Sequence, residues 1–190
     1  ITALGGASGS GKSGVFAALR AAAPFTGSCT FGGVSTAELD PSTWLAWAGQ
    51  SPVLFAGTVT SNVSLGSGSD DAIVTWALRT AGASEISADA VIAADGSGLS
   101  GGQAQRVAVA RALYRWHVGA AEVIALDEPS SALDADAEAA LWAGLRQVAD
   151  EGATVLLISH RPSAFALADA VGLIDDQAHV AALLLRRQHL

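Results

Sequence analysis

The residues best suited to chemistry lie at 6–13, which reads Gly-Ala-Ser-Gly-Ser-Gly-Lys-Ser. This segment fits the pattern G-x-x-x-x-G-K-[ST], with Gly6, Gly11, Lys12 and Ser13 at the fixed positions. Glycine lets backbone N–H groups approach a phosphate chain closely, and the helix that follows directs its positive end at the same phosphates. Lys12 supplies a charge for the β- and γ-phosphates, and the Ser13 hydroxyl is a ligand for Mg²⁺. A chance Gly-Ser turn is the alternative, but a strand-like segment before the loop and a helical face after it favour nucleotide binding.

Two adjacent carboxylates, Asp127 and Glu128, end the apolar run 123–126. A carboxylate at a strand end beside the phosphate loop is placed to hold Mg²⁺, directly or through water. The next carboxylate is placed to polarise an attacking water as a general base. The alternative is an Asp-Glu-Pro turn that only caps the next helix, and these two residues alone do not decide between the two interpretations.

Three further segments have polar groups at the ends of predicted helices or strands. Residues 99–103, Leu-Ser-Gly-Gly-Gln, begin a helix with a hydroxyl, glycines and a positive helix end, which predicts a second phosphate-touching surface. The alternative there is an ordinary helix cap. His160 follows an apolar strand and could contact a γ-phosphate, and Gln50 lies just past another strand, where its amide could contact Mg²⁺ or water. As single residues, both are more often plain surface groups.

Apolar periodicity predicts the elements that position these residues. The expected strands lie at 1–4, 28–31, 44–48, 122–126, 154–159 and 171–175. The expected helices lie at 11–22, 58–65, 70–81, 100–114, 134–149, 162–168 and 180–190, and residues 83–98 are expected to be irregular. Strands that alternate with helices indicate an α/β fold with a mostly parallel sheet. The helix-rich stretch 55–117 interrupts that alternation and is expected to form an inserted helical subdomain.

Composition limits the possible classes of protein. The chain has 190 residues, which suffices for a single domain over 1–190, with an α/β core at about 1–54 and 118–190. It is 51% hydrophobic and 15% charged, which excludes a disordered chain and fits a buried parallel sheet or a docking surface. The net charge of -8 argues against a broad basic face for nucleic acid. Cys29 is the only cysteine, so an internal disulfide is excluded.

Taken together, these motifs resemble those of the nucleotide-binding domain of ATP-binding-cassette (ABC) transporters. They occur in the same order as in that family, and the resemblance covers nearly the whole chain. Residues 6–13 resemble Walker A, and Gln50 in Gln-Ser-Pro-Val-Leu-Phe resembles the Q-loop of exporter-type domains. Residues 99–103 match the family signature, 123–128 resemble Walker B, 131–134 resemble the D-loop, and His160 resembles the switch histidine. The ordered set of motifs is far more specific than Walker A alone. It favours a functional role for Gln50 and His160 over the interpretation of each as a plain surface residue.

The resemblance implies a P-loop NTPase fold, ATP and Mg²⁺ as ligands, and roles for named residues. The implied ATP-binding residues are Gly6, Ser8, Gly9, Ser10, Gly11, Lys12, Ser13 and Gly14. The implied catalytic residues are Glu128, His160 and Gln50, and the implied Mg²⁺ partners are Ser13, Gln50 and Asp127. The residues implied to face the ATP of a second domain are Leu99, Ser100, Gly101, Gly102 and Gln103, with a D-loop at Ser131, Ala132, Leu133 and Asp134.

The resemblance also implies partners and a location. In this family two nucleotide-binding domains pair head to tail, with ATP between Walker A of one and the signature of the other. The expected partners are a second such domain, identical or not, and transmembrane domains at the cytoplasmic face of the cell membrane, and no nucleic acid is expected. The adenine-stacking aromatic and the first antiparallel strands of the family would precede Walker A, so the chain, which begins at Ile1, is expected to be an N-terminally truncated fragment.

The sequence is compatible with three functions. The first is an ATP hydrolase that powers an ABC exporter. The second is a soluble ABC ATPase of DNA repair or translation, but the short stretch 51–98 between the Q-loop and the signature shows no heptad run. The third is a cassette that binds ATP and closes but hydrolyses poorly, which the intact Glu128, His160 and Leu-Ser-Gly-Gly-Gln disfavour.

Overall fold

The computed structural model describes residues 1–7, 9–66, 68, 70–94 and 97–174. The predicted phosphate contact at Ser8 and the predicted helix at 180–190 lie outside this described part. The strands are β1 (Thr2–Gly5), β2 (Thr30–Phe31), β3 (Val34–Ser35), β4 (Leu45–Ala48), β5 (Gly57–Thr58), β6 (Val91–Ile92), β7 (Val123–Asp127), β8 (Thr154–Ile158) and β9 (Ala170–Leu173). The α-helices are α1 (Lys12–Leu19), α2 (Val59–Ser64), α3 (Asp71–Thr80), α4 (Gly101–His117), α5 (Ala135–Asp150) and α6 (Pro162–Leu167), and short 3₁₀ turns span Thr36–Glu38 and Pro41–Thr43.

A five-stranded sheet with the order β4-β7-β8-β1-β9 forms the centre of the fold, and every neighbouring pair in it is parallel. The predicted α/β class with a mostly parallel sheet is therefore confirmed. The central strands are buried on both faces, which explains why their sequences are continuous apolar runs rather than alternating ones.

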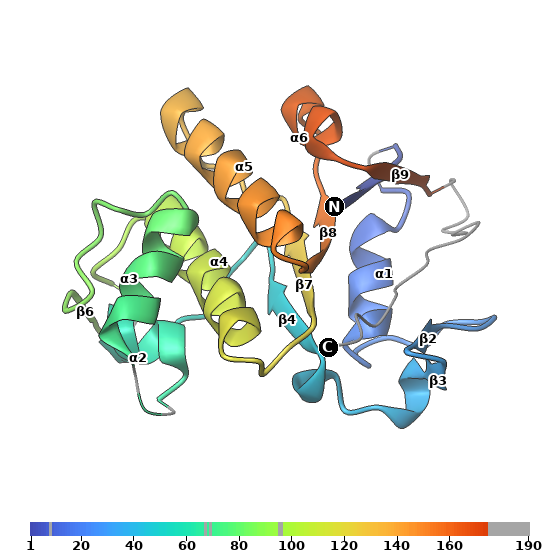
Figure 1. Ribbon diagram of the computed structural model, residues 1–190, viewed down its shortest axis with the longest axis horizontal. Coiled ribbons are helices and arrows are strands. Elements are labelled where there is room, and N and C mark those ends of the chain that lie inside the picture. The colour runs from blue at the N-terminus through green and yellow to red at the C-terminus, as the bar shows by residue number, and fades with distance from the viewer. Residues whose placement is uncertain (8, 67, 69, 95–96, 175–190) are drawn as a thin grey trace.

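Helices cover both faces of this sheet (Figure 1). Along β7, Ile124 and Leu126 belong to the core that includes residues of α4 and α5, while Val123 and Ala125 belong to the core that contains Phe16 of α1. This alternation follows from the two-residue period of a strand. Helices α2 and α3 pack on α4, and α4 also contacts β4 and β7 directly.

Several element boundaries differ from the predicted ones. Helix α1 ends at Leu19 rather than near residue 22, because Ala21 adopts a left-handed conformation (φ 55°). The backbone N–H of Ala22 then donates to the carbonyl of Ala17, which closes the helix end in a Schellman-type arrangement. Helix α4 continues to His117, three residues past the predicted end. The stretch predicted to be irregular holds the short strand β6, which pairs with β5.

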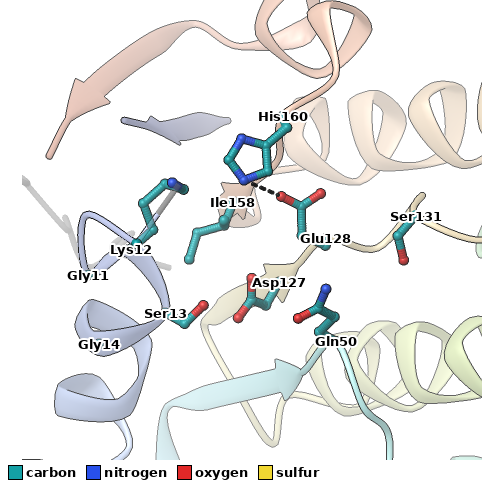
Figure 2. A pocket seen from close by; sticks show the side chains of 11 residues that line it. Gly11, Lys12, Ser13, Gly14, Gln50, Asp127, Glu128, Ser131, Ile158 and His160 are labelled. Atoms are coloured by element: carbon teal, nitrogen blue, oxygen red, sulfur yellow. Dashed lines mark ion pairs between the residues drawn. The ribbon is translucent and has the colours of Figure 1, made fainter. Parts of the chain in front are cut away.

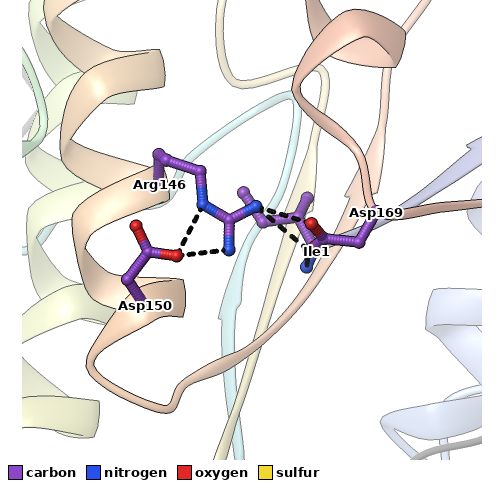
Figure 3. A network of polar contacts seen from close by, with 4 residues as sticks. All are labelled: Ile1, Arg146, Asp150 and Asp169. Atoms are coloured by element: carbon purple, nitrogen blue, oxygen red, sulfur yellow. Dashed lines mark hydrogen bonds and ion pairs between the residues drawn. The ribbon is translucent and has the colours of Figure 1, made fainter.

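A surface ion network links the end of α5 to the segment before β9 (Figure 3). Arg146 donates to Asp150, four residues on, and to both carboxylate oxygens of Asp169, which also accepts from the backbone nitrogen of Ile1. The Asp169 side chain is 60% exposed, so solvent screening keeps the contribution of this network to stability small.

Helices α3 and α5 approach each other closely at Gly144. A Cβ atom at this position would lie 2.4 Å from the carbonyl oxygen of Thr80, the last residue of α3. We expect Gly144→Ala to lower the free energy of unfolding by about 1–3 kcal/mol, because the added methyl group forces the two helices apart. Urea denaturation followed by circular dichroism measures the effect.

The matched control is Gly14→Ala in α1, where an added Cβ meets no atom within 4 Å. Alanine there should raise the free energy of unfolding by roughly 0.5–1 kcal/mol, because it restricts the unfolded chain at no steric cost. Equal shifts of the denaturation midpoint in the two variants would contradict the steric explanation for Gly144.

Candidate functional site

A cavity of about 520 Å³ lies at the carboxyl edge of the sheet (Figure 2). Strands β4, β7, β8 and β1 are neighbours and parallel, so the segments that follow them emerge together at this edge. The residues that line the cavity are Gly9, Gly11, Lys12, Ser13, Gly14, Gln50, Asp127, Glu128, Ser131, Ile158 and His160. The structure therefore brings together residues from four separate segments of the sequence.

The loop between β1 and α1 depends on glycine conformations. Gly9 and Gly11 have φ values of 82° and 89°, which side chains rarely adopt. Gly11 is the N-cap of α1 and provides no side-chain cap, so the first N–H groups of this helix are left for an external acceptor. Such an uncapped helix start is suited to bind an anion.

Lys12 is 6% exposed, and its amine is directed back into the loop. The Nζ atom donates to the carbonyl oxygens of Gly6 at 2.9 Å and Ala7 at 2.6 Å. Both acceptors are neutral. A phosphate oxygen in the cavity would be a stronger acceptor than either, because its negative charge attracts the Lys12 ammonium group.

Two of the predicted phosphate-loop residues, Gly6 and Ser10, do not line the cavity. A Cβ atom on Gly6 would lie 2.5 Å from the carbonyl oxygen of Ile174, so only glycine fits between the loop and the chain after β9. The Ser10 hydroxyl is buried and has no hydrogen-bond partner among the described residues.

Three oxygen-bearing side chains reach the cavity from three elements: Ser13 from α1, Asp127 from the end of β7 and Gln50 from the loop after β4 (Figure 2). Asp127 is 5% exposed, and among the described residues no side chain donates a hydrogen bond to its carboxylate. Within the same part of the chain, no group of three or more His, Cys, Asp or Glu side chains could hold a metal ion. The chemistry of this donor set, a hydroxyl, an amide and a single carboxylate, fits Mg²⁺, which takes few protein ligands and completes its shell with water and phosphate oxygens.

Glu128 and His160 face each other across the cavity, with 3.4 Å between Glu128 Oε1 and His160 Nε2 (Figure 2). The Glu128 side chain is 14% exposed and that of His160 is 57% exposed. Apart from this approach, Glu128 Oε1 is buried without a hydrogen-bond partner among the described residues. A buried carboxylate oxygen that is not otherwise satisfied is available to accept a proton.

The segment that carries His160 is anchored to α5 through Glu138. The Glu138 carboxylate accepts hydrogen bonds from Arg161, from Ser163 and from Trp142 Nε1, the last at 2.9 Å. Burial disfavours the charged form of Glu138, but these hydrogen bonds and the charge of Arg161 outweigh it and hold the pKa of Glu138 below its usual range. This network ties Arg161, next to His160, and the first turn of α6 to α5.

The predicted signature residues 99–103 do not line the cavity. Ser100 is the N-cap of α4: its Oγ accepts from the N–H of Gln103, and Gln103 Oε1 accepts from the N–H of Ser100. This capping box is the ordinary helix cap that the sequence left open as an alternative. Ser100 is nevertheless exposed, so its hydroxyl can meet a second molecule.

The four predicted D-loop residues lie in different environments. Ser131 lines the cavity, Ala132 is exposed, Leu133 is buried in the core, and the Asp134 side chain caps α5 by accepting from the N–H of Ala137. The segment thus runs from the cavity to the start of α5.

Sequence reasoning missed two residues at the site. Ile158 lines the cavity, and its position at the end of an apolar strand was the available signal. Gln105 on α4 is 4% exposed and donates to the carbonyl of Glu128. A glutamine within a run of apolar and small residues was the signal there, but only the fold shows what this side chain contacts.

Comparison with known proteins shows the family to which the chain belongs. A family model described as "ABC transporter" matches residues 1–131. The chain belongs to the ABC transporter family. Two relatives of this ABC domain are ABC transporter B family member 1 of Dictyostelium discoideum and the ATP-dependent lipid A-core flippase of Burkholderia orbicola. They are 38% and 36% identical to the domain, with 92% of the chain covered in each case.

A solved structure of a bacterial Atm1-family ABC exporter with ATP bound matches the fold of the ABC domain. The TM-score is 0.81 at 29% identity, and the match covers 95% of this chain and 32% of the exporter chain. The domain spans 20% and 30% of the lengths of the two relatives named above. Among its described residues, none of the helices has the length and apolarity needed to cross a membrane.

Proposed function

We propose that this ABC domain binds and hydrolyses ATP, and that hydrolysis powers export through an ABC transporter. One observation carries the proposal: Lys12, Ser13, Asp127, Glu128 and His160, which come from distant parts of the sequence, line one cavity at the carboxyl edge of the sheet. In that arrangement a loop that would bind phosphates, oxygen atoms that would hold a cation and a carboxylate that would act as general base lie within reach of one another.

ATP binding is assigned to the loop between β1 and α1. The N–H groups of the loop and of the first turn of α1 would hold the phosphates, and Lys12 would exchange its two carbonyl acceptors for β- and γ-phosphate oxygens. Ser13, Gln50 and Asp127 would hold Mg²⁺. The bound cation would neutralise negative charge on the phosphates.

Hydrolysis is assigned to Glu128, with His160 as the residue that senses the γ-phosphate. Glu128 would accept a proton from water as the water oxygen bonds to the γ-phosphorus and the bond to the bridging oxygen of ADP breaks. The uncompensated Glu128 Oε1 supports this role. The 3.4 Å approach of His160 Nε2 supports a shared function for the two side chains.

The remaining phosphate contacts are assigned to a second cassette, because residues 99–103 do not line the cavity of their own chain. The exposed start of α4 would meet the ATP held by the partner, and residues 131–134 would lie along the same interface. The site is then completed only when two domains, identical or not, close head to tail.

The export part of the proposal rests on the named relatives, an ATP-dependent flippase among them, and on the exporter with a similar fold. These names favour transport over DNA repair or translation. We assign residues 55–117 to a helical subdomain and the rest to the α/β core. Val53 and Phe55, 82% and 41% exposed on the segment after Gln50, are candidates to contact membrane domains at the cytoplasmic face of the membrane.

The proposal is tested by the rate of ATP hydrolysis as a function of protein concentration, with Mg²⁺ present. A specific activity that rises with protein concentration is expected, because each complete site needs two domains. An activity that is absent at all concentrations in the full-length protein would refute hydrolysis, and a Mg²⁺-dependent activity that stays constant down to dissociating dilution would refute the composite site.

A further inference from the structure

A buried glutamine links the start of α4 to the candidate general base. Gln105 lies in the second turn of α4 and is 4% exposed. Its Nε2 donates to the backbone carbonyl of Glu128 at 2.8 Å, and its Oε1 accepts from the Ser131 hydroxyl at 3.2 Å. One side-chain amide therefore joins both ends of the segment 128–131.

Chemistry determines the orientation of this amide. The carbonyl of Glu128 has no proton to donate, so the side of Gln105 that faces it must be the NH₂ group. The opposite side then presents Oε1 to Ser131, whose hydroxyl can donate. Both polar ends of the buried side chain are satisfied in this orientation and in no other.

The backbone that Gln105 holds is strained. Glu128 has φ 51°, in the left-handed region, and such a conformation costs a non-glycine residue about 1–2 kcal/mol. Its N–H donates to the carbonyl of Ile158, and its carbonyl accepts from Gln105 and from the N–H of Ser131. Strained residues persist where their surroundings hold them, and they cluster at functional sites.

The first turn of α4 also lies directly against this segment. A Cβ atom on Gly102 would be 3.1 Å from the carbonyl oxygen of Ala132. The start of α4 and the segment after Glu128 therefore pack as one unit, and Gln105 is the polar connection inside it.

We infer that Gln105 is a positioning residue for Glu128 of its own chain. By holding the Glu128 carbonyl, it keeps the backbone in the left-handed conformation that directs the carboxylate into the cavity. This inference rests on the proposed ATPase function. Gln105 would therefore act on the ATP site whose general base comes from its own chain. The residues at the start of α4, by contrast, are proposed to serve the ATP bound by the partner.

Two variants of the full-length protein test the role. Gln105→Met removes the donor with little change in volume, and Gln105→Glu keeps the shape but presents carboxylate oxygens to the Glu128 carbonyl at neutral pH. The single-turnover rate constant at saturating ATP should fall by roughly 10- to 100-fold, the cost of misplacing a catalytic group by about 1 Å. The Kd for ATP should change by less than about threefold, since Gln105 does not line the cavity.

The matched control is Gln147→Met, the same exchange at an exposed glutamine of α5. It should leave the rate constant unchanged. Equal rate constants for the wild-type protein, Gln105→Met and Gln105→Glu would overturn the inference. So would a loss of ATP affinity in proportion to the loss of rate, because that result would indicate a general disruption of the site.

A mixing experiment separates action within one chain from action on the partner. One chain carries Ser100→Arg, which blocks its signature, and the other carries Glu128→Gln, which removes its base. In the mixed dimer a single site is complete: the one with Glu128 of the first chain and Ser100 of the second. Gln105→Met is then added to either chain in turn.

Loss of activity only when Gln105→Met is in the chain with intact Glu128 is the expected result. The inference would be overturned if activity were lost only when Gln105→Met is in the chain with intact Ser100. It would also be overturned if Gln105→Met caused no loss of activity in either chain. A mixture without Gln105→Met that shows no activity, although the wild-type protein is active, would instead refute the composite site on which the inference rests.

Discussion

Replacing Glu128 by glutamine should reduce the turnover of ATP by at least about 100-fold, the lower end of what a general base contributes. Glutamine has the same shape and adopts the same backbone conformation, but it cannot take a proton from water. The Kd for ATP should stay within about threefold of the wild-type value, because the proposed phosphate contacts come from the loop and Lys12. Steady-state phosphate release and equilibrium binding of a fluorescent ATP analogue measure the two quantities.

The control for Glu128→Gln is Glu38→Gln, which removes the same charge at an exposed position away from the cavity. It should hydrolyse ATP at the wild-type rate. Turnover that is unchanged in Glu128→Gln would remove Glu128 from the role of general base and would leave His160 as the remaining titratable side chain opposite it.

Replacing Lys12 by methionine should weaken ATP binding by about 10- to 100-fold, as expected when charge-assisted hydrogen bonds worth about 1.5–3 kcal/mol are lost. The change removes the cationic side chain that lies in the cavity wall and donates to Gly6 and Ala7. Methionine has a similar length and remains compatible with a buried site. Equilibrium binding of ATP in the absence of hydrolysis measures the effect.

Arg20→Met serves as the control for Lys12→Met, because it removes one positive charge from a residue that lies over the Trp47 ring and outside the cavity. Similar losses of ATP affinity in the two variants would mean that net charge, rather than a contact of Lys12 with phosphate, determines binding. Retained affinity in Lys12→Met would contradict the assignment of Lys12 to the phosphates.

The local features of the fold could be read from the sequence with few errors. Continuous apolar runs that end in polar residues predicted β4, β7 and β8, because strands buried on both faces leave no polar alternation. The end of α1 could not be predicted, since Ala21 adopts a left-handed conformation that sequence propensity assigns to glycine. The pairing of β6 with β5 was missed as well, because two residues carry no periodic signal.

The sequence also determined the chemistry of the cavity, from the glycine-rich loop with Lys12 and Ser13 to the carboxylates Asp127 and Glu128. Their types and order sufficed because the loop follows β1 and the two carboxylates lie at the end of β7, and parallel strands place their carboxyl ends at a common edge. Only the tertiary structure decided that Gln105 holds the backbone of Glu128 and that Glu138 anchors the segment around His160. Those contacts join side chains on helices to distant loops, and the packing of the helices against the sheet, which no local pattern encodes, brings them together.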